Sequence, residues 1–276
     1  VDPDALSLMW TAGTGAIRSE VYIGTNAAAV GNAQKPIGDV NGDGLVDILD
    51  LAETAAQWLA APADPCADLN YSGRVDLADV AELSRSWGQS ADVLYLGAAS
   101  GNSIDPPDPI SVNKTYYWRV DTVRCDGIEK GAVWNFKTLR PAFPGAEGFG
   151  KWASGGRGGS VYHVTNLNDS GPGSFRDAVS ATNRTVVFDV GGVIHIGARI
   201  VVSKDITIAG QTAPGEGVAI YGNGLSFTNA NRTIARYMRF RMGKIGASGK
   251  DGIAIANGTN MIFDHCSVSW GRDENF

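Results

Sequence analysis

The sequence predicts a mainly β protein with more than one domain, and three observations carry that prediction. Glycine accounts for 36 of 276 residues, about 13%, against ~7% in ordinary globular chains. Charged residues make up 19%, below the usual ~25%. Short β-branched segments bounded by Gly or Asn fill the second half of the chain. Because 43% of the residues are hydrophobic and no Gly-X-Y period is present, a turn-rich β protein is favoured over a collagen or a disordered chain.

Residues 1–36 and 91–139 are predicted to form one small β domain that a different module interrupts. Alternating apolar and polar residues predict strands over 6–26, 115–123 and 133–138. Together the two flanks have the size of a single β-sandwich. Exposed loop tips of a sandwich tolerate insertions, which accounts for the interruption.

The strand over 115–123 is expected to have one apolar and one polar face. The residues expected to point inward are Tyr116, Trp118 and Val120. The residues expected to point to solvent are Tyr117, Arg119 and Asp121. The flanks contain no catalytic constellation, and we interpret Trp10 and Trp134 as core residues rather than as a platform for sugars.

Charge is distributed unevenly along the chain. Residues 37–90 carry ten acids and two arginines, a net charge of −8, whereas residues 140–276 carry a net charge of +4. The acidic middle is expected to bind cations, and the basic C-terminal part suits an acidic partner. Cys66, Cys125 and Cys266 are too few and too scattered for a disulfide framework or a Cys-pair zinc site.

Residues 37–90 contain two copies of one pattern, with equivalent positions 29 residues apart. The first copy, DVNGDGLVDILD, has oxygen-bearing side chains at loop positions 1, 3, 5, 9 and 12 and glycine at position 6. Calcium takes six to eight oxygen ligands, and the glycine permits a sharp turn around the ion. Position 7 would contribute its main-chain carbonyl. The candidate calcium ligands are Asp39, Asn41, Asp43, Leu45, Asp47 and Asp50 in the first loop and Asp68, Asn70, Ser72, Arg74, Asp76 and Asp79 in the second.

A helix-like stretch follows each loop, and no helix is predicted before either loop. Two such loop–helix repeats, with Asp at position 12, resemble a dockerin domain. The resemblance implies a module that folds around two calcium ions and docks onto a cohesin-bearing scaffold. In dockerins, positions 10 and 11 face the cohesin. Here they are Ile48–Leu49 and Leu77–Ala78, not the hydroxyl pairs of the best-known cellulosomal type, so a module that packs within its own chain is the alternative. The flanking strands resemble a fibronectin type III-like domain.

Residues 140–276 are predicted to form a parallel β-helix. Short β-branched strands recur there, and Ile206, Ile234 and Ile262 are 28 residues apart. Rungs of this length, turned by Gly and Asn, stack into a continuous core. A β-sandwich is the alternative on the period alone.

Ordered motifs in this segment resemble the family 1 polysaccharide lyases, the pectate lyases. They run from GAEGFGKWASGGRGGS through VVFDVGGVIHI, ITIAGQTAPG and YMRFRMG to IFDHCSVSWGRDE, covering 143–276 almost continuously. The resemblance implies a right-handed parallel β-helix that cleaves pectate, an acidic polysaccharide, by calcium-assisted β-elimination. In that reaction a base removes the C5 proton, the C4 oxygen leaves, and a cation held by protein acids stabilises the charge that develops on the neighbouring carboxylate.

The resemblance also implies a calcium site in this segment. Asp251 matches one calcium ligand of the family, and Asp273 and Glu274 lie near the position of the later ligands. The family's catalytic base is an arginine on a later strand, which is expected beyond Phe276. We therefore expect these 276 residues alone to show no elimination activity.

Four further residues are candidates for supporting roles. Asp264 and His265 match a motif that supports the family's site, with a satisfied core histidine as the alternative for His265. Arg239 and Arg241 alternate onto one strand face and are candidates for binding the acidic polymer, with a structural role equally open.

These patterns predict a pectate lyase-like enzyme that carries a dockerin. The alternatives are a protein that binds acidic polysaccharide without cleaving it and an assembly component whose dockerin binds a cohesin. We expect a secreted, extracellular bacterial protein, because polymeric pectin does not enter cells. Nucleic-acid and membrane partners are not expected, since the chain has no nucleic-acid reader motif and no apolar run of ~18 residues.

Overall fold

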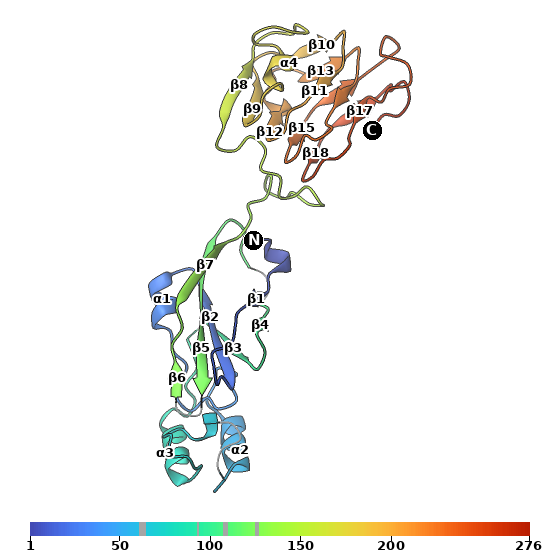
Figure 1. Cartoon of the computed structure of the whole chain (residues 1–276). Helices are drawn as coiled ribbons and strands as arrows, with labels where there is room; N and C mark the ends of the chain where they lie inside the picture. The colour runs from blue at the N-terminus through green and yellow to red at the C-terminus, as the bar shows by residue number, and fades with distance from the viewer. Residues whose placement is uncertain (61–64, 93, 107–109, 125–126) are drawn as a thin grey trace. The chain divides into compact units, whose positions relative to one another are not determined.

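The computed structural model describes residues 1–60, 65–92, 94–106, 110–124 and 127–276. The chain divides into two units, Val1–Leu139 (unit 1) and Arg140–Phe276 (unit 2), and strands dominate both (Figure 1). Cys125 lies outside the described residues. Within them, no helix has the length and apolar character needed to span a membrane.

Unit 1 contains a five-stranded antiparallel sheet and a two-stranded ladder. The sheet consists, in spatial order, of β3 (Tyr95–Ala99), β2 (Arg18–Gly24), β5 (Thr115–Arg124) and β6 (Gly127–Glu129), with β7 (Val133–Lys137) paired to the first half of β5. The ladder joins β1 (Leu8–Met9) to β4 (Ser103–Ile104), and a 3-10 helix (Pro3–Ala5) precedes it.

Apolar side chains cover both faces of the five-stranded sheet. On one face, Leu8, Val21 and Val120 are buried, and Trp118 packs against them. On the other face, the short helix α1 (Ala27–Asn32) buries its Val30 in a cluster with Tyr22 and Ala33. Trp10 also joins the first cluster, as expected of a core residue, whereas Trp134 is 45% exposed.

The expected polar face of β5 is not a solvent face. Arg119 and Asp121 are buried, with 1% and 5% exposure. Arg119 donates from Nε and Nη2 to the Asp121 carboxylate, at 2.7 and 2.8 Å, and its guanidinium also donates to the main-chain carbonyls of Val30 and Ala33. These carbonyls lie at the C-terminal end of α1, where helix C=O groups lack partners within the helix. The prediction was wrong because α1 covers this face, and its six residues are too few to show a helical period.

Residues 37–90 fold around two helices, α2 (Ile48–Ala56) and α3 (Leu77–Arg85), which lie beyond one end of the sheet (Figure 1). Each helix begins directly after one of the repeated loops. Each has an aspartate N-cap whose side chain accepts from the helix, while an aspartate three residues later accepts from the N-cap main chain. The expectation that no helix precedes the loops was wrong, since α1 and a 3-10 helix (Pro65–Ala67) precede the first and second loops.

The two helices share a small apolar core. Its buried members are Val40, Val46, Ala67, Val75 and Leu83. Val46 and Val75 are equivalent positions of the two loop copies, so the sequence repeat corresponds to a repeated structure.

Unit 2 is a parallel β-solenoid of about four turns, which confirms the predicted parallel β-helix. Sheet 1 consists of β8 (Ser160–Val164), β9 (Arg184–Phe188), β12 (Ile206–Ala209), β15 (Ile234–Arg236) and β18 (Ile262–Asp264). Sheet 2 consists of β10 (Gly192–His195), β13 (Val218–Tyr221), β16 (Arg239–Arg241) and β19 (Ser267–Ser269). Sheet 3 consists of β11 (Ile200–Val201), β14 (Leu225–Ser226) and β17 (Ile253–Ala254). A short helix, α4 (Phe175–Ala178), and a 3-10 helix (Gly210–Thr212) complete the unit.

The solenoid core is built from stacked inward residues of the three sheets. In sheet 3, for example, Ile200, Leu225 and Ile253 pair in register and are all buried. Ile234 pairs with Ile262, as the spacing of 28 residues predicts, but Thr207 rather than Ile206 pairs with Ile234. The spacing between paired positions is therefore one residue shorter in the earlier turn, because the length of a turn varies with its loops.

Candidate functional site

Three acids that the sequence marks as metal ligands lie together at the start of sheet 3. Carboxylate oxygens of Asp251, Asp273 and Glu274 all lie within 4.8 Å of one another. Within the described ranges of the chain, this acid cluster is the one group of three or more His, Cys, Asp or Glu side chains with such spacing. Asp251 is half-buried, and the other two are exposed.

The solenoid register brings together acids that lie 22 positions apart in the sequence, Asp251 and Asp273. Asp251 lies two positions before the first residue of β17, and the chain returns to its side after β19. Gly252 N–H donates to the Glu274 carbonyl and Ile253 N–H to the Asn275 carbonyl, both at 3.0 Å. These bonds continue the sheet 3 ladder, so residues 274–275 occupy the next rung beside β17. Gly224 occupies the preceding rung, where a Cβ would lie 2.3 Å from the Asp251 carbonyl oxygen.

The acid cluster has the chemistry of a site for a hard cation. Three like charges within 4.8 Å repel one another unless a cation neutralises them. Calcium takes six to eight oxygen ligands, so three carboxylates would leave positions for water or for a carboxylate of a bound polymer. Arg199 is the nearby cationic residue, and its Nη2 donates to the Asp251 carbonyl at 3.5 Å.

Asp264 and His265 lie at a different corner of the solenoid, between sheets 1 and 2. Asp264 accepts from Arg236 Nε at 2.6 Å, and its other oxygen lies 2.8 Å from His265 Nδ1. Burial raises the pKa of Asp264, but the hydrogen bonds from His265 and Arg236 outweigh burial and hold that pKa below its ordinary value. The His265 ring is 59% exposed and stacks on Tyr237, with 4.5 Å between centroids. This geometry fits residues that fix a corner of the solenoid.

Arg239 and Arg241 lie on β16 in sheet 2, on either side of the buried Phe240. They therefore share one outward face, as their alternation suggests. Arg239 donates to the Glu216 carbonyl. Arg241 donates to the Ser267 carbonyl at 2.8 Å and to its Oγ at 2.7 Å. Both arginines thus join neighbouring rungs of sheet 2, whereas the acid cluster lies at sheet 3.

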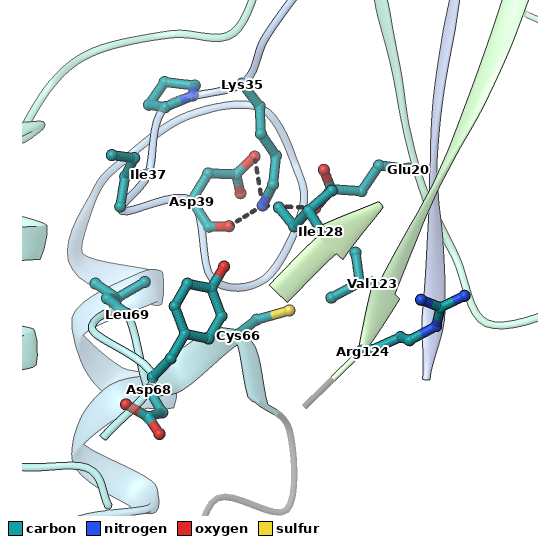
Figure 2. A pocket seen from close by; sticks show the side chains of 12 residues that line it. Glu20, Lys35, Ile37, Asp39, Cys66, Asp68, Leu69, Val123, Arg124 and Ile128 are labelled. Atoms are coloured by element: carbon teal, nitrogen blue, oxygen red, sulfur yellow. Dashed lines mark hydrogen bonds and ion pairs between the residues drawn. The ribbon is translucent and has the colours of Figure 1, made fainter. Parts of the chain in front are cut away.

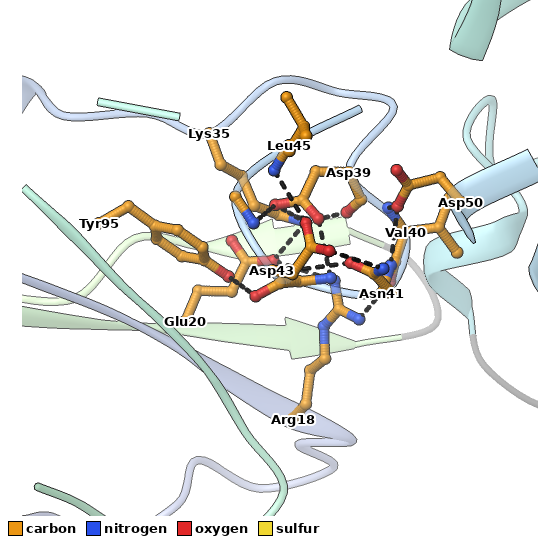
Figure 3. Close-up of polar contacts among 12 residues, drawn as sticks. Arg18, Glu20, Lys35, Asp39, Val40, Asn41, Asp43, Leu45, Asp50 and Tyr95 are labelled. Carbon is orange, nitrogen blue, oxygen red and sulfur yellow. Dashed lines mark hydrogen bonds and ion pairs between the residues drawn. The ribbon is translucent and has the colours of Figure 1, made fainter. Parts of the chain in front are cut away.

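The first repeated loop of unit 1 lies against the five-stranded sheet (Figure 3). Asp39, at loop position 1, is 1% exposed and accepts from Gly42 N–H at 2.8 Å and Gly44 N–H at 3.1 Å. Lys35 Nζ lies 3.0 Å from Glu20 Oε1 and 3.8 Å from Asp39 Oδ2. Burial raises the pKa of Asp39, and the nearby Lys35 ammonium opposes that rise.

The position-12 acids of the loops are also buried. Asp50 accepts from the N–H groups of Val40, Asn41 and Asp47, at 2.7, 3.1 and 2.8 Å. Asp79, its equivalent, accepts from Asn70 and Asp76. The loop carboxylates therefore bind main-chain N–H groups and are less closely gathered than the acid cluster. Four of them are buried with at most 2% exposure, namely Asp39, Asp50, Asp68 and Asp79. Burying carboxylates is costly without a cation, so this all-oxygen donor set also fits calcium.

A pocket separates the second loop from the sheet of unit 1 (Figure 2). Its apolar lining includes Ile37, Leu69 and Ile128. Lys35 crosses one side of it and links Glu20 on β2 to Asp39. The ion pair attaches the inserted module to the sheet, and neither Glu20 nor Lys35 was singled out from the sequence.

An open groove in unit 2 was also missed from the sequence. It is lined by Tyr221, Gly243, Lys244, Trp270, Gly271 and Arg272. The sequence does contain a feature that could have predicted this groove, since Trp270 directly precedes the GRDE segment. An aromatic residue beside candidate metal ligands is typical of a carbohydrate site.

No family model matches the chain. Among curated proteins, the Probable pectate lyase C of Aspergillus terreus is 71% identical over 135 residues, which cover 49% of this chain and 32% of that protein. The Probable pectate lyase C of Aspergillus fumigatus is 71% identical over 139 residues, covering 50% and 33%. Pectate lyase 1 of Ambrosia artemisiifolia is 30% identical over 151 residues, covering 46% and 37%. The chain thus spans about a third of the length of the curated relatives it matches.

A crystal structure of jun a 1, the major allergen from cedar pollen, aligns with a TM-score of 0.38 and 23% identity. It covers 46% of this chain and 43% of that one, and at this TM-score it supports no conclusion. The sequence identities show that part of the chain is similar to lyase enzymes. About half of the chain is homologous to pectate lyases, which confirms that part of the resemblance.

The expectation of a secreted bacterial protein is contradicted. The relatives that are 67–71% identical come from Aspergillus and related fungi. That expectation rested on the calcium loops and on the nature of the polymer. Neither feature carries information about the lineage of the organism.

Proposed function

We propose that this chain is part of a polysaccharide lyase that cleaves pectate by calcium-assisted β-elimination. The observation that carries the proposal is the 71% identity to proteins named pectate lyase. The acid cluster supports it, since three carboxylates gathered within 4.8 Å suit calcium. Calcium bound there would neutralise a uronate carboxylate and so make the adjacent C–H proton easier to remove.

The role of this chain's own residues is to bind and orient the polymer. Asp251, Asp273 and Glu274 would hold the cation at an exposed edge, where a polymer carboxylate can complete its coordination. Unit 2 carries a net charge of about +4, which favours the approach of a polyanion.

Affinity electrophoresis in gels that contain polygalacturonate tests the calcium-dependent binding. We expect retardation of the chain with calcium and none with a chelator. Asp251→Asn should abolish retardation, and Glu216→Gln, which removes an exposed acid outside the cluster, should not. Retardation that persists in chelator, or in Asp251→Asn, would contradict the proposal.

Catalysis itself can be tested in a chimera. The later rungs of the Aspergillus terreus relative would be joined after Phe276 to supply the expected arginine. A lyase then releases 4,5-unsaturated products that absorb ultraviolet light. A chimera that binds polygalacturonate but releases no such product favours the alternative, a protein that binds acidic polysaccharide without cleaving it.

We further propose that residues 37–90 form a dockerin-like calcium module within a fibronectin type III-like domain. Its support is the repeated loop–helix unit with buried acids at equivalent positions. Ile48 and Leu77, both at position 10 of their loops, are 62% and 71% exposed. An exposed apolar pair at equivalent positions suits a partner such as a cohesin.

Calorimetric titration with calcium tests the module separately from the acid cluster. We expect three ions per chain in the wild type and two in Asp251→Asn. Adding Asp39→Ala and Asp68→Ala should remove the remaining two. A variant Asp251→Asn that binds no calcium would refute the module's calcium sites. Capture on immobilised cohesins, with calcium and with chelator, tests docking, and Leu77→Arg should weaken it.

A further inference from the structure

The groove at the end of sheet 2 combines one exposed and one half-buried aromatic ring with basic side chains. Tyr221 ends β13, Lys244 lies in the turn after β16, and Trp270 directly follows β19. Three successive rungs of one sheet therefore each contribute one wall residue. Trp270 is 63% exposed, so a large aromatic face is open to a ligand.

The backbone holds Trp270 in a conformation that a bulky residue rarely adopts. Its φ is +63°, in the left-handed region, which costs about 1–2 kcal/mol for a residue with a Cβ. Gly243 N–H donates to the Trp270 carbonyl at 2.9 Å, and the next residue, Gly271, donates to Asn275 Oδ1 at 2.9 Å. Such strain persists only where the surroundings enforce it, and it concentrates at functional sites.

The second ring is fixed as well. Gly243 has φ of +73°, and a Cβ there would lie 2.8 Å from the Tyr221 ring. Only glycine therefore allows the turn to pass so close to that ring. The edge of His195 packs against Tyr221, with 5.0 Å between centroids and 77° between planes. The groove is thus preorganised, which lowers the entropy cost of binding.

The charge of the groove is positive. Arg272 donates to the carbonyls of Lys244 and Gly246 and so holds the turn that carries Lys244. The guanidinium of Arg241 lies 6.0 Å from the centre of the Trp270 ring. Among the ion pairs of the described residues, none involves Arg241 or Lys244. Their charges are available to an anionic ligand.

We propose that this groove binds one uronate ring of an acidic polysaccharide, next to the acid cluster. The apolar face of the sugar would stack on Trp270, and its carboxylate would be bound by Lys244 and Arg241. Arg272 lines the groove and is followed directly by Asp273 and Glu274, so the groove and the acid cluster adjoin along the chain. The inference rests on the proposed function and names a subsite for its substrate.

Calorimetry with hexagalacturonate in excess calcium tests the subsite on the whole chain. We expect Trp270→Ala to weaken the Kd about tenfold and Trp270→Phe to stay within about threefold of the wild type. Lys244→Gln should also weaken binding and reduce its dependence on salt. Phe149→Ala is the matched control, because that aromatic side chain is fully exposed and lies outside the groove.

The outcomes separate the two proposals. Wild-type binding with unchanged Kd in Trp270→Ala overturns the subsite and leaves the lyase proposal standing. No binding by the wild type overturns both. Trp270→Ala should bind as many calcium ions as the wild type in a calcium titration. If it lost a calcium site, the substitution would act by disordering the cluster, and the subsite would also be overturned.

Discussion

Replacing Asp251 with asparagine should change the local stability of unit 2 in opposite directions with and without calcium. In chelator, the variant lacks one of three mutually repelling carboxylates, so its last rungs should be more stable than those of the wild type. In excess calcium, the wild type gains the free energy of ion binding and the variant loses most of it. If the local stability of each protein is plotted against calcium concentration, the plots for the wild type and the variant should therefore cross.

The size of each effect follows from the geometry. At the 4.8 Å within which the cluster's carboxylate oxygens lie, two unit charges repel by about 0.9 kcal/mol at the dielectric constant of water. Asp251→Asn removes two such pairs, and screening at physiological ionic strength reduces their sum to about 1 kcal/mol. In calcium at 100 times its Kd, the wild type gains about 2.7 kcal/mol. We expect a variant that is about 1 kcal/mol more stable in chelator and about 1–2 kcal/mol less stable in calcium.

Hydrogen exchange of the Gly252 and Ile253 amides is the assay, because both donate to the rung that carries Glu274. The exchange rates of these two amides report the stability of unit 2 alone, so calcium binding in unit 1 does not affect the comparison. Glu216→Gln, which removes an exposed acid elsewhere in unit 2, should show the wild-type response. If Asp251→Asn destabilises these amides equally in chelator and in calcium, the three carboxylates do not act as a metal site and the reasoning fails.

Two further predictions concern ion pairs. Arg119→Met leaves the buried Asp121 without its cation and should destabilise unit 1 by about 3–5 kcal/mol. Arg124→Ala is the control, because it breaks an exposed ion pair with Glu129 and should cost about 0–1 kcal/mol. Urea unfolding followed by tryptophan fluorescence measures this, since five of the seven tryptophans lie in unit 1, and equal costs would contradict the prediction. The hydrogen bond from Arg232 lowers the pKa of Asp205 in the folded state, so its contribution is present above about pH 4 and is lost as the pH falls through the folded pKa. Asp205→Asn should therefore lose less stability than the wild type between pH 5 and pH 2, and identical acid unfolding of the two proteins would count against this pair.

The sequence predicted those features that repeat or that depend on residue type alone. The two loop copies, with Asp47 and Asp76 as N-caps, form equivalent structures because the same side chains satisfy the same orphan N–H groups. The solenoid followed from short β-branched strands with Gly and Asn at the corners. The grouping of Asp251 with Asp273 and Glu274 followed only from resemblance to a family, since no local pattern brings together residues 22 positions apart.

What the sequence missed depends on contacts between distant segments. Arg119 looked like a surface residue because alternation reports two faces of a strand but not what covers each face. The helix that covers it has six residues, fewer than two turns. The 28-residue spacing gives the pairing of Ile234 with Ile262 but not the earlier pairing of Thr207 with Ile234, because solenoid turns differ in length. The Trp270 groove is assembled from three rungs and becomes visible only when they stack.

Under the proposed function, a metal ion in the acid cluster would couple metal binding to the order of the solenoid. Its ligands come from both sides of one ladder, since Asp251 precedes β17 and Glu274 lies on the rung that pairs with it. A cation shared by these rungs would hold them in register, and the same segment leads back through Arg272 to Trp270. Loss of calcium should therefore loosen residues 270–276 and the groove together. Stacking of a sugar on Trp270 and metal binding then depend on one another, although Trp270 itself is no metal ligand. The affinity for hexagalacturonate should therefore fall in chelator by more than the loss of one carboxylate contact would explain.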